Sequence, residues 1–197
     1  GRRHLANVRR LAGDRGIDVA PIPMTAGLTP AALADAIARA RVDAVFNHGS
    51  YSVYVGIIKS LRAKGLTPMF MAVNSGAAQM ARELGPEGRG LVFTQVVPCP
   101  WGVAVPVGKE FQQALAKYAP ATPPSFSGLE GYIGAKVLVA GLRAAGRDLT
   151  RAGIQRAMEG LGTVDVGGML VRYRPGAHTG STFVDTVIVA SDGRFSR

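Results

Sequence analysis

The clearest structural signal in the chain is residues 42–73, VDAVFNHGSYSVYVGIIKSLRAKGLTPMFMAV. The short apolar run over residues 42–46 predicts a strand, and residues 52–64 predict a helix that ends at Gly65. A second apolar run over residues 69–73 predicts another strand. A strand, a helix and a strand in this order are typical of a βαβ unit, so the stretch indicates an α/β protein with a parallel sheet.

The same alternation continues on both sides of this stretch. Upstream, residues 17–23 predict a strand. Thr29 and Pro30 then predict the start of a helix to about residue 40, because threonine caps helices well and proline is favoured at the first helical position. Downstream, residues 77–84 predict a helix, and residues 91–97 predict a buried strand after a glycine-rich turn. Strands that alternate with helices in this way favour a parallel sheet.

The pattern changes at residue 98. Residues 98–106 contain three prolines, which favour an extended crossing segment rather than another strand and helix. Three helices are predicted next, over residues 108–118, 128–145 and 150–161, and Thr150 is the expected N-cap of the third. The final part predicts a hairpin, in which residues 167–173 pair with residues 182–190, followed by a turn at Asp192 and Gly193.

Composition excludes several classes of protein. The 197 residues are 47% hydrophobic and 18% charged, which excludes a disordered chain or a coiled coil. The net charge of +10 invites a nucleic-acid interpretation, but the basic residues are spread along the chain. The densest basic group, within residues 2–10, flanks Leu5, Val8 and Leu11 at helical spacing, so it is the solvated face of an amphipathic helix. We therefore expect no nucleic-acid partner.

Catalytic and metal-binding patterns are absent from the sequence. Cys99 is the single cysteine, so the chain has no intrachain disulfide and no thiolate metal cluster. His4, His48 and His178 lack the spacing of metal ligands, and there is neither a Gly-x-Ser-x-Gly elbow nor a phosphate-binding loop. No long apolar stretch is free of charged residues, which argues against a membrane-spanning helix. We expect a protein without enzymatic activity, metal or cofactor.

Polar residues follow two neighbouring strands of the predicted sheet. Ser50 and Tyr51 come after the first strand, and Asn74 and Ser75 come after the second. Ligands of open parallel sheets bind beyond the carboxyl ends of strands, where helix N-termini favour an anion such as a carboxylate. These four residues are therefore candidate ligand-binding residues. The alternative is that Ser52 and Asn74 only cap helices while Tyr51 covers the end of the sheet.

Several sequence motifs occur together in the order that one known protein family shows. They are DAVFNHGSY at 43–51, IKSLRAKGL at 58–66, ELGPEGRGLVFTQVVP at 83–98, LEGY at 129–132, GSTFV at 180–184 and SDGRF at 191–195. With these motifs the chain resembles the C-terminal half of type I periplasmic substrate-binding proteins of ABC transporters, in the branched-chain amino acid (Leu/Ile/Val)-binding class. The resemblance implies two α/β lobes, joined by crossing segments, that trap a ligand in the cleft between them.

The resemblance also implies an assignment of the chain to these lobes. Residues 1–97 would form the doubly wound parallel sheet of the second lobe, without its first strand, and residues 98–106 would cross between lobes. Residues 107–162 would be helices of the first lobe, and residues 163–197 would return to the second lobe as a hairpin. The chain would then be half of a longer protein whose precursor carries a signal peptide.

The implied function is that of the periplasmic solute-binding component of an ABC importer, which delivers a small ligand to a membrane permease. Tyr51 and Ser50 would anchor the ligand, and Asn74 and Ser75 would orient it. Asn74 stands where amino-acid binders of the family place a glutamate, and an amide cannot neutralise an ammonium group. This departure leaves the expected ligand open among an amino acid, an organic acid, an aromatic acid and an amide. Trp101 is expected to form an apolar wall of the site or to pack at the hinge.

A second function remains open from the sequence. Transcriptional regulators reuse the same two-lobe fold, so the chain could be the ligand-sensing core of a cytoplasmic regulator or an amide sensor. A signal peptide upstream would support transport, whereas a helix-turn-helix would support regulation.

Overall fold

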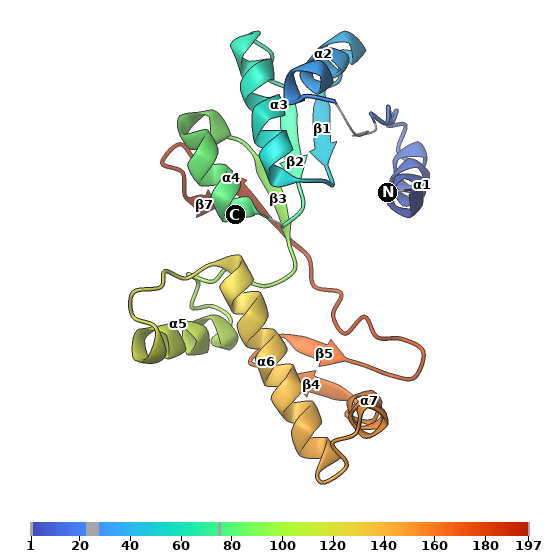
Figure 1. The fold of residues 1–197 in the computed structure, drawn as a ribbon, viewed down its shortest axis with the longest axis vertical. Helices are drawn as coiled ribbons and strands as arrows, with labels where there is room; N and C mark the ends of the chain where they lie inside the picture. The colour runs from blue at the N-terminus through green and yellow to red at the C-terminus, as the bar shows by residue number, and fades with distance from the viewer. Residues whose placement is uncertain (1, 23–27, 75, 197) are drawn as a thin grey trace. The chain divides into compact units, whose positions relative to one another are not determined.

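The computed structural model describes residues 2–22, 28–74 and 76–196, with side chains from residue 5 onward. The chain divides into two compact units (Figure 1). Gly1–Thr94 and Thr186–Arg197 form one of them, hereafter unit 1, and Gln95–Asp185 form unit 2. The division cuts strands β3 and β6 at their ends, so the chain passes between the units at two points.

Unit 1 is built around a five-stranded sheet in the order β1-β2-β3-β6-β7. The strands are β1 (Ala44–Asn47), β2 (Met69–Ala72), β3 (Val92–Gln95), β6 (Asp185–Val189) and β7 (Phe195–Ser196). β1, β2 and β3 run parallel, which confirms the prediction from residues 42–73. β6 and β7 are antiparallel, and the turn between them lies at Asp192 and Gly193, as expected.

The helices of unit 1 begin and end close to the predicted positions. They are α1 (Arg2–Gly13), α2 (Pro30–Ala40), α3 (Tyr51–Ala63), α4 (Ala77–Leu84) and the 3₁₀ turn η1 (Gly85–Gly88). The Thr29 hydroxyl accepts a hydrogen bond from the Ala32 N–H at 3.2 Å, which is the predicted cap of α2. Figure 1 shows α2 and α3 side by side near β1 and β2.

The core of unit 1 lies between these helices and the sheet. Leu33 of α2, Ile58 and Leu61 of α3 and Phe70 of β2 are at most 3% exposed. Tyr54 of α3 is equally buried, and its hydroxyl donates to the Val45 carbonyl at 2.7 Å. Burial raises the pKa of this phenol, so it stays neutral and ties α3 to β1.

The predicted strand over residues 17–23 is not observed. Residues 17–22 have no regular secondary structure, Ile17 is 57% exposed, and Pro23 lies outside the described residues. Within the part of the chain that the structure describes, β1 is the edge of the sheet, and Phe46 on it is 49% exposed. A strand forms only when a neighbour accepts and donates its backbone hydrogen bonds, which alternation of apolar residues cannot supply.

Unit 2 consists of three helices and a small antiparallel sheet. They are α5 (Pro106–Tyr118), α6 (Phe126–Ala145), α7 (Arg151–Gly160), β4 (Thr163–Asp165) and β5 (Leu170–Arg172). Hydroxyl groups cap two of the helices, since Ser125 accepts from the Gly128 N–H and Thr150 accepts from the Gly153 N–H. The Thr150 cap was predicted from the sequence.

The predicted terminal hairpin is wrong. β5 pairs with β4 inside unit 2, whereas β6 joins β3 and β7 in the sheet of unit 1. Gly167 and Gly168 have φ of 107° and 84°, and both donate their N–H groups to the Asp165 carboxylate, at 2.9 and 2.6 Å. This turn folds β5 back onto β4. The three residues of β4 are too few to show an alternating pattern, so the sequence reading assigned β5 the wrong partner.

Candidate functional site

The candidate site lies at the carboxyl ends of β1 and β2. Asn47 and Ala72, the last residues of these strands, are paired in the sheet. Because the strands are parallel and end level with each other, the loops that lead into α3 and α4 start at the same edge of the sheet. Ser50 is on the first loop, Tyr51 is the first residue of α3, and Asn74 is on the second loop.

The two loops pack directly against each other through Tyr51 and Gly76. Gly76 has φ of 74°, and a Cβ atom built on it would lie 2.8 Å from Cγ and Cδ1 of the Tyr51 ring. The ring of Tyr51 therefore rests on the backbone of Gly76, and only glycine leaves room for it. The tertiary structure brings the two predicted loops together, and the half-buried Tyr51 ring forms the contact.

The N-termini of α3 and α4 both begin at this contact. Ser50 is at the N-cap position of α3, but its hydroxyl bonds to the Ser52 hydroxyl at 2.8 Å instead of capping the helix. Gly76 is at the N-cap position of α4 and has no side chain to offer. Ser52 therefore lies inside α3 and bonds to Ser50, so it does not cap the helix as the alternative interpretation expected. Helix N-termini that lack a side-chain cap attract anions with their N–H groups and dipoles.

Asn47 is a polar residue of the site that the sequence analysis missed. It is 7% exposed, and its amide nitrogen donates to the Gly49 carbonyl at 3.4 Å. This contact holds the loop that presents Ser50 and Tyr51. The signal in the sequence was an amide residue at the end of a short apolar strand.

Ser75 and Trp101 are the other two predicted site residues. Ser75 lies outside the described residues. Trp101 belongs to unit 2, where its ring is 43% exposed and meets the Phe126 ring edge to face, with 5.4 Å between the ring centroids. Gln112 of α5 also donates to the Pro100 and Gly102 carbonyls, at 3.0 and 3.3 Å, so the segment around Trp101 is held to the helices of unit 2.

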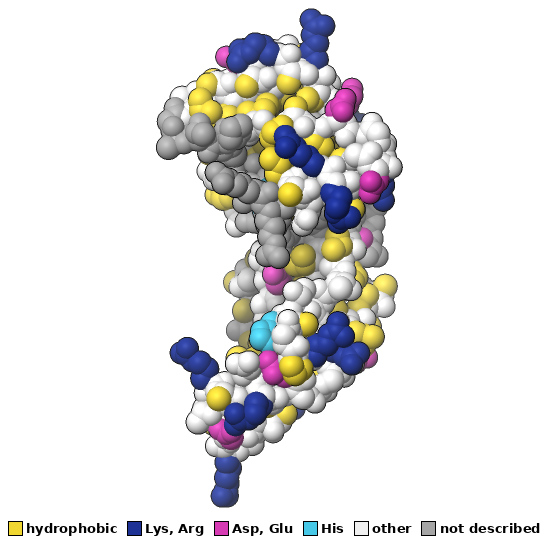
Figure 2. Space-filling model, turned by 90° about the vertical axis from the view of Figure 1, so that its right-hand side faces the viewer, with side chains coloured by type: hydrophobic (Ala, Val, Ile, Leu, Met, Phe, Trp, Pro, Cys, Tyr) yellow, Lys and Arg dark blue, Asp and Glu magenta, His cyan; other side chains and the backbone are white. Residues whose placement is uncertain are grey.

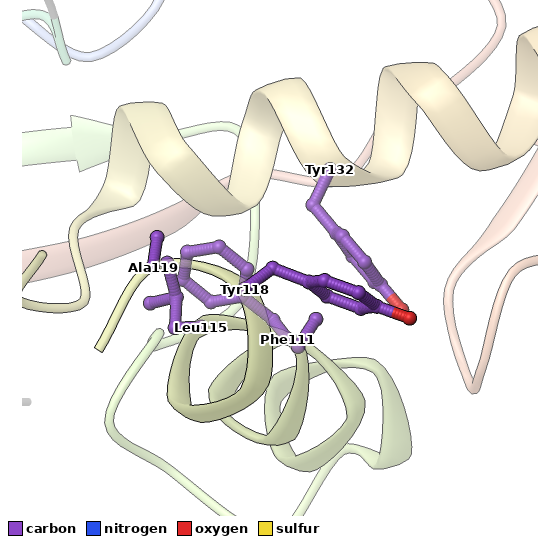
Figure 3. Close-up of a pocket in the computed structure, with 6 residues that line it drawn as sticks. Phe111, Leu115, Tyr118, Ala119 and Tyr132 are labelled. Carbon is purple, nitrogen blue, oxygen red and sulfur yellow. The ribbon is translucent and has the colours of Figure 1, made fainter.

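Unit 2 contains an apolar groove of about 390 Å³ between α5 and α6. Its lining residues are Phe111, Ala114, Leu115, Tyr118, Ala119 and Tyr132. Tyr132 reaches down from α6, and the other residues come from α5 and the position after it (Figure 3). The groove offers aromatic and aliphatic contacts and has no charged lining residue that could orient a polar ligand.

Metal and membrane signatures are also missing from the described part of the chain. Across residues 2–22, 28–74 and 76–196, no three or more His, Cys, Asp or Glu side chains are grouped in a way that could hold a metal ion. In the same residues, no helix combines the length and the apolar character needed to cross a bilayer.

Comparison with known families identifies the chain. The model of the periplasmic binding protein family matches residues 1–193. This match covers nearly the whole chain, and the α/β fold with its parallel strands agrees with it. The chain belongs to the periplasmic binding protein family. The proteins of this family bind solutes for transporters and are not enzymes. No match was found among curated protein sequences.

Solved structures show the same fold. The chain is 28% identical, with a TM-score of 0.79, to a possible leucine/isoleucine/valine-binding protein from Rhodopirellula baltica, over 98% of this chain and 54% of that one. It is 27% identical, with a TM-score of 0.84, to a substrate-binding periplasmic protein from Ralstonia solanacearum, over 99% and 57%. A fatty acid ABC transporter substrate-binding protein from Thermomonospora curvata shares the fold at 20% identity and a TM-score of 0.81, over 98% and 51%. The chain thus spans about half the length of these proteins.

Proposed function

We propose that the chain is part of the extracytoplasmic solute-binding component of an ABC importer and that it binds a small carboxylate at the carboxyl ends of β1 and β2. The observation that carries the proposal is the contact between Tyr51 and Gly76, which joins two helix N-termini whose N-cap residues make no side-chain capping bond. N–H groups at such termini complement a carboxylate. The similar proteins are described as binders of leucine, isoleucine and valine or of fatty acid, all of which carry that group.

Within this class we favour an organic or aromatic acid over an α-amino acid. The loops of the site, residues 47–52 and 74–76, contain no Asp or Glu. Asn74 can donate and accept hydrogen bonds but leaves an ammonium group without a counter-charge. Loss of a charge-assisted hydrogen bond weakens binding by about 1.5–3 kcal/mol. Ser50 and Tyr51 are the proposed anchors of the carboxylate, and Asn74 and Ser75 are the proposed orienting groups.

We assign unit 1 to the second lobe of such a protein, residues 98–106 to a crossing segment, and the helices of unit 2 to the first lobe. The surface of α6 supports this assignment. One face of α6 is buried through Leu129, Ile133 and Val137, whereas Leu138 and Val139 on the other side are 51% and 42% exposed. A helix that is apolar on both sides is suited to a position between two layers. On this assignment, Trp101 would line the cleft from the crossing segment.

The full protein would present its ligand to a membrane permease after its lobes close by a hinge motion. Its place would be the periplasm, as the family description suggests. The regulator alternative shares the fold, and the sequence encoded upstream of residue 1 distinguishes the two. A signal peptide there favours the importer, and a helix-turn-helix overturns it.

Calorimetry on the full-length protein tests the site. The probes are leucine, valine, benzoate and phenylacetate, and the variants are Ser50→Ala and Tyr51→Ala. We expect an acid to bind and each variant to weaken it tenfold or more, since about 1.4 kcal/mol corresponds to a tenfold change. Ser191→Ala is the matched control, because Ser191 is exposed in the turn after β6 and should leave affinity unchanged. Binding that survives Tyr51→Ala refutes the site, and turnover of a bound solute refutes passive binding.

A further inference from the structure

A second pocket lies at the opposite ends of the same strands. It has a volume of about 420 Å³ and is formed where α2 and α3 end and the chain enters β1 and β2. Its lining residues are Ile37, Ala38, Arg41, Val42, Leu61, Leu66, Thr67 and Pro68. All of these residues belong to unit 1. Residues 42 and 66–68 precede the strands, whereas the proposed solute site follows them, so the two sites are separate.

The pocket has an apolar floor and a single charged lining residue. Ile37 is 7% exposed and Leu61 is fully buried, so both present apolar surface that is already shielded from water. Leu66 is 38% exposed at the rim. Arg41 is the only charged residue of the lining, and the Thr67 hydroxyl is the only other polar side chain. Figure 2 shows apolar side chains gathered between Lys and Arg side chains on the surface of unit 1.

The backbone of Arg41 is strained. It has φ of 49° and ψ of 48°, and it is the only non-glycine residue with positive φ in the described part of the chain. Arg41 ends α2 at a position where glycine is usual, because a Cβ atom crowds the backbone in the left-handed region. Strained residues of this kind are concentrated at functional sites.

The side chain of Arg41 has no polar partner among the described residues. No described residue forms a hydrogen bond or an ion pair with its side chain. The neighbouring cation behaves differently, since Lys64 at the end of α3 pairs with Asp35 at 3.0 Å. An unpaired guanidinium beside an apolar pocket complements a ligand with an anionic head and an apolar tail.

We propose that this pocket binds an aliphatic carboxylate, with the carboxylate on Arg41 and the hydrocarbon chain against Ile37, Leu61 and Leu66. A carboxylate matches the single guanidinium in charge and planar geometry, whereas a phosphate would need further donors that the apolar lining lacks. The pocket does not depend on the solute site, and it would give unit 1 a second ligand position away from the cleft.

The test is NMR of the full-length protein, methyl-labelled at Ile and Leu, during titration with octanoate. We expect the Ile37 and Leu61 methyl signals to shift, and we expect Arg41→Gln to weaken this binding tenfold or more. Arg39→Gln is the matched control, because Arg39 is also on α2 but does not line the pocket. Arg41→Gly should abolish binding while it raises the midpoint of thermal unfolding, since glycine relieves the strain.

Three outcomes overturn the proposal. The first is that octanoate leaves the Ile37 and Leu61 signals unchanged, and the second is that Arg41→Gln binds it like wild type. The third is that octylamine, which has the same tail and the opposite charge, shifts the same signals equally. The titration is repeated in Tyr51→Ala, where the solute site is disabled. Shifts at Ile37 and Leu61 that persist there support this pocket whatever the fate of the solute site.

Discussion

Gly76 is the position at which a single added methyl group tests the architecture of the proposed solute site. Gly76→Ala introduces two separate costs. The residue keeps φ of 74°, where an L-residue is less stable than glycine by about 1–2 kcal/mol. The new Cβ atom would also lie 2.8 Å from two ring carbons of Tyr51, and such overpacking costs about 1–3 kcal/mol. We expect a total loss of about 2–5 kcal/mol.

Gly65→Ala separates these two costs. Gly65 has φ of 72°, but a Cβ atom built on it meets nothing within 4 Å. This control should therefore cost only the backbone part, about 1–2 kcal/mol. The double variant Gly76→Ala with Tyr51→Ala should recover the steric part, which gives a coupling energy of about 0.5–3 kcal/mol.

Urea unfolding of the full-length protein and of these variants measures the changes, and calorimetry with the bound acid measures the consequence for the site. Affinity should fall in Gly76→Ala and stay unchanged in Gly65→Ala. The reasoning is refuted if Gly76→Ala costs no more than Gly65→Ala, or if removal of the Tyr51 ring recovers nothing. Either result would mean that the ring does not rest on Gly76 and that the two loops are not held together by this contact.

Three further predictions concern other parts of the fold. Tyr54→Phe removes the bond to the Val45 carbonyl and should lower the free energy of unfolding by about 0.5–1.5 kcal/mol, measured in urea, with no change in solute affinity. The N–H groups of Gly168 and Gly167 lower the pKa of Asp165, so this carboxylate contributes stability above its ordinary pKa and loses that contribution as pH falls through the lowered pKa. The difference in the free energy of unfolding between wild type and Asp165→Asn should therefore shrink in acid. A difference that stays constant with pH would contradict the assignment. Leu138→Glu should destabilise the full-length protein by about 2 kcal/mol or more in thermal unfolding if the exposed face of α6 is covered there, and an effect within 0.5 kcal/mol would argue against our lobe assignment.

Much of the secondary structure could be predicted from the sequence, because it depends on interactions between residues that are close together in the chain. Thr29 and Thr150 cap their helices as predicted, since a hydroxyl reaches an N–H three residues ahead whatever the rest of the fold does. The parallel strands and the helix within residues 42–73 follow from apolar runs of the right lengths and from Gly65. The positions of Ser50, Tyr51 and Asn74 after two strands were predictable for the same reason.

Contacts between residues that are far apart in the chain could not be predicted in this way. The sequence predicted the wrong partner for β5, because any alternating segment can pair with any other, and the turn at Gly167 and Gly168 selected β4. Residues 17–22 have a strand-like pattern and no strand, because pairing needs a neighbouring edge.

The sequence by itself determined the α/β alternation, the helix ends and the family, because periodicity, caps and motifs act over a few residues. Only the tertiary structure decided that the Tyr51 ring lies on Gly76 and that a strained Arg41 borders an apolar pocket. Both depend on how segments far apart in the chain pack. That packing is set by the burial of apolar surface over the whole unit, and no single segment encodes it.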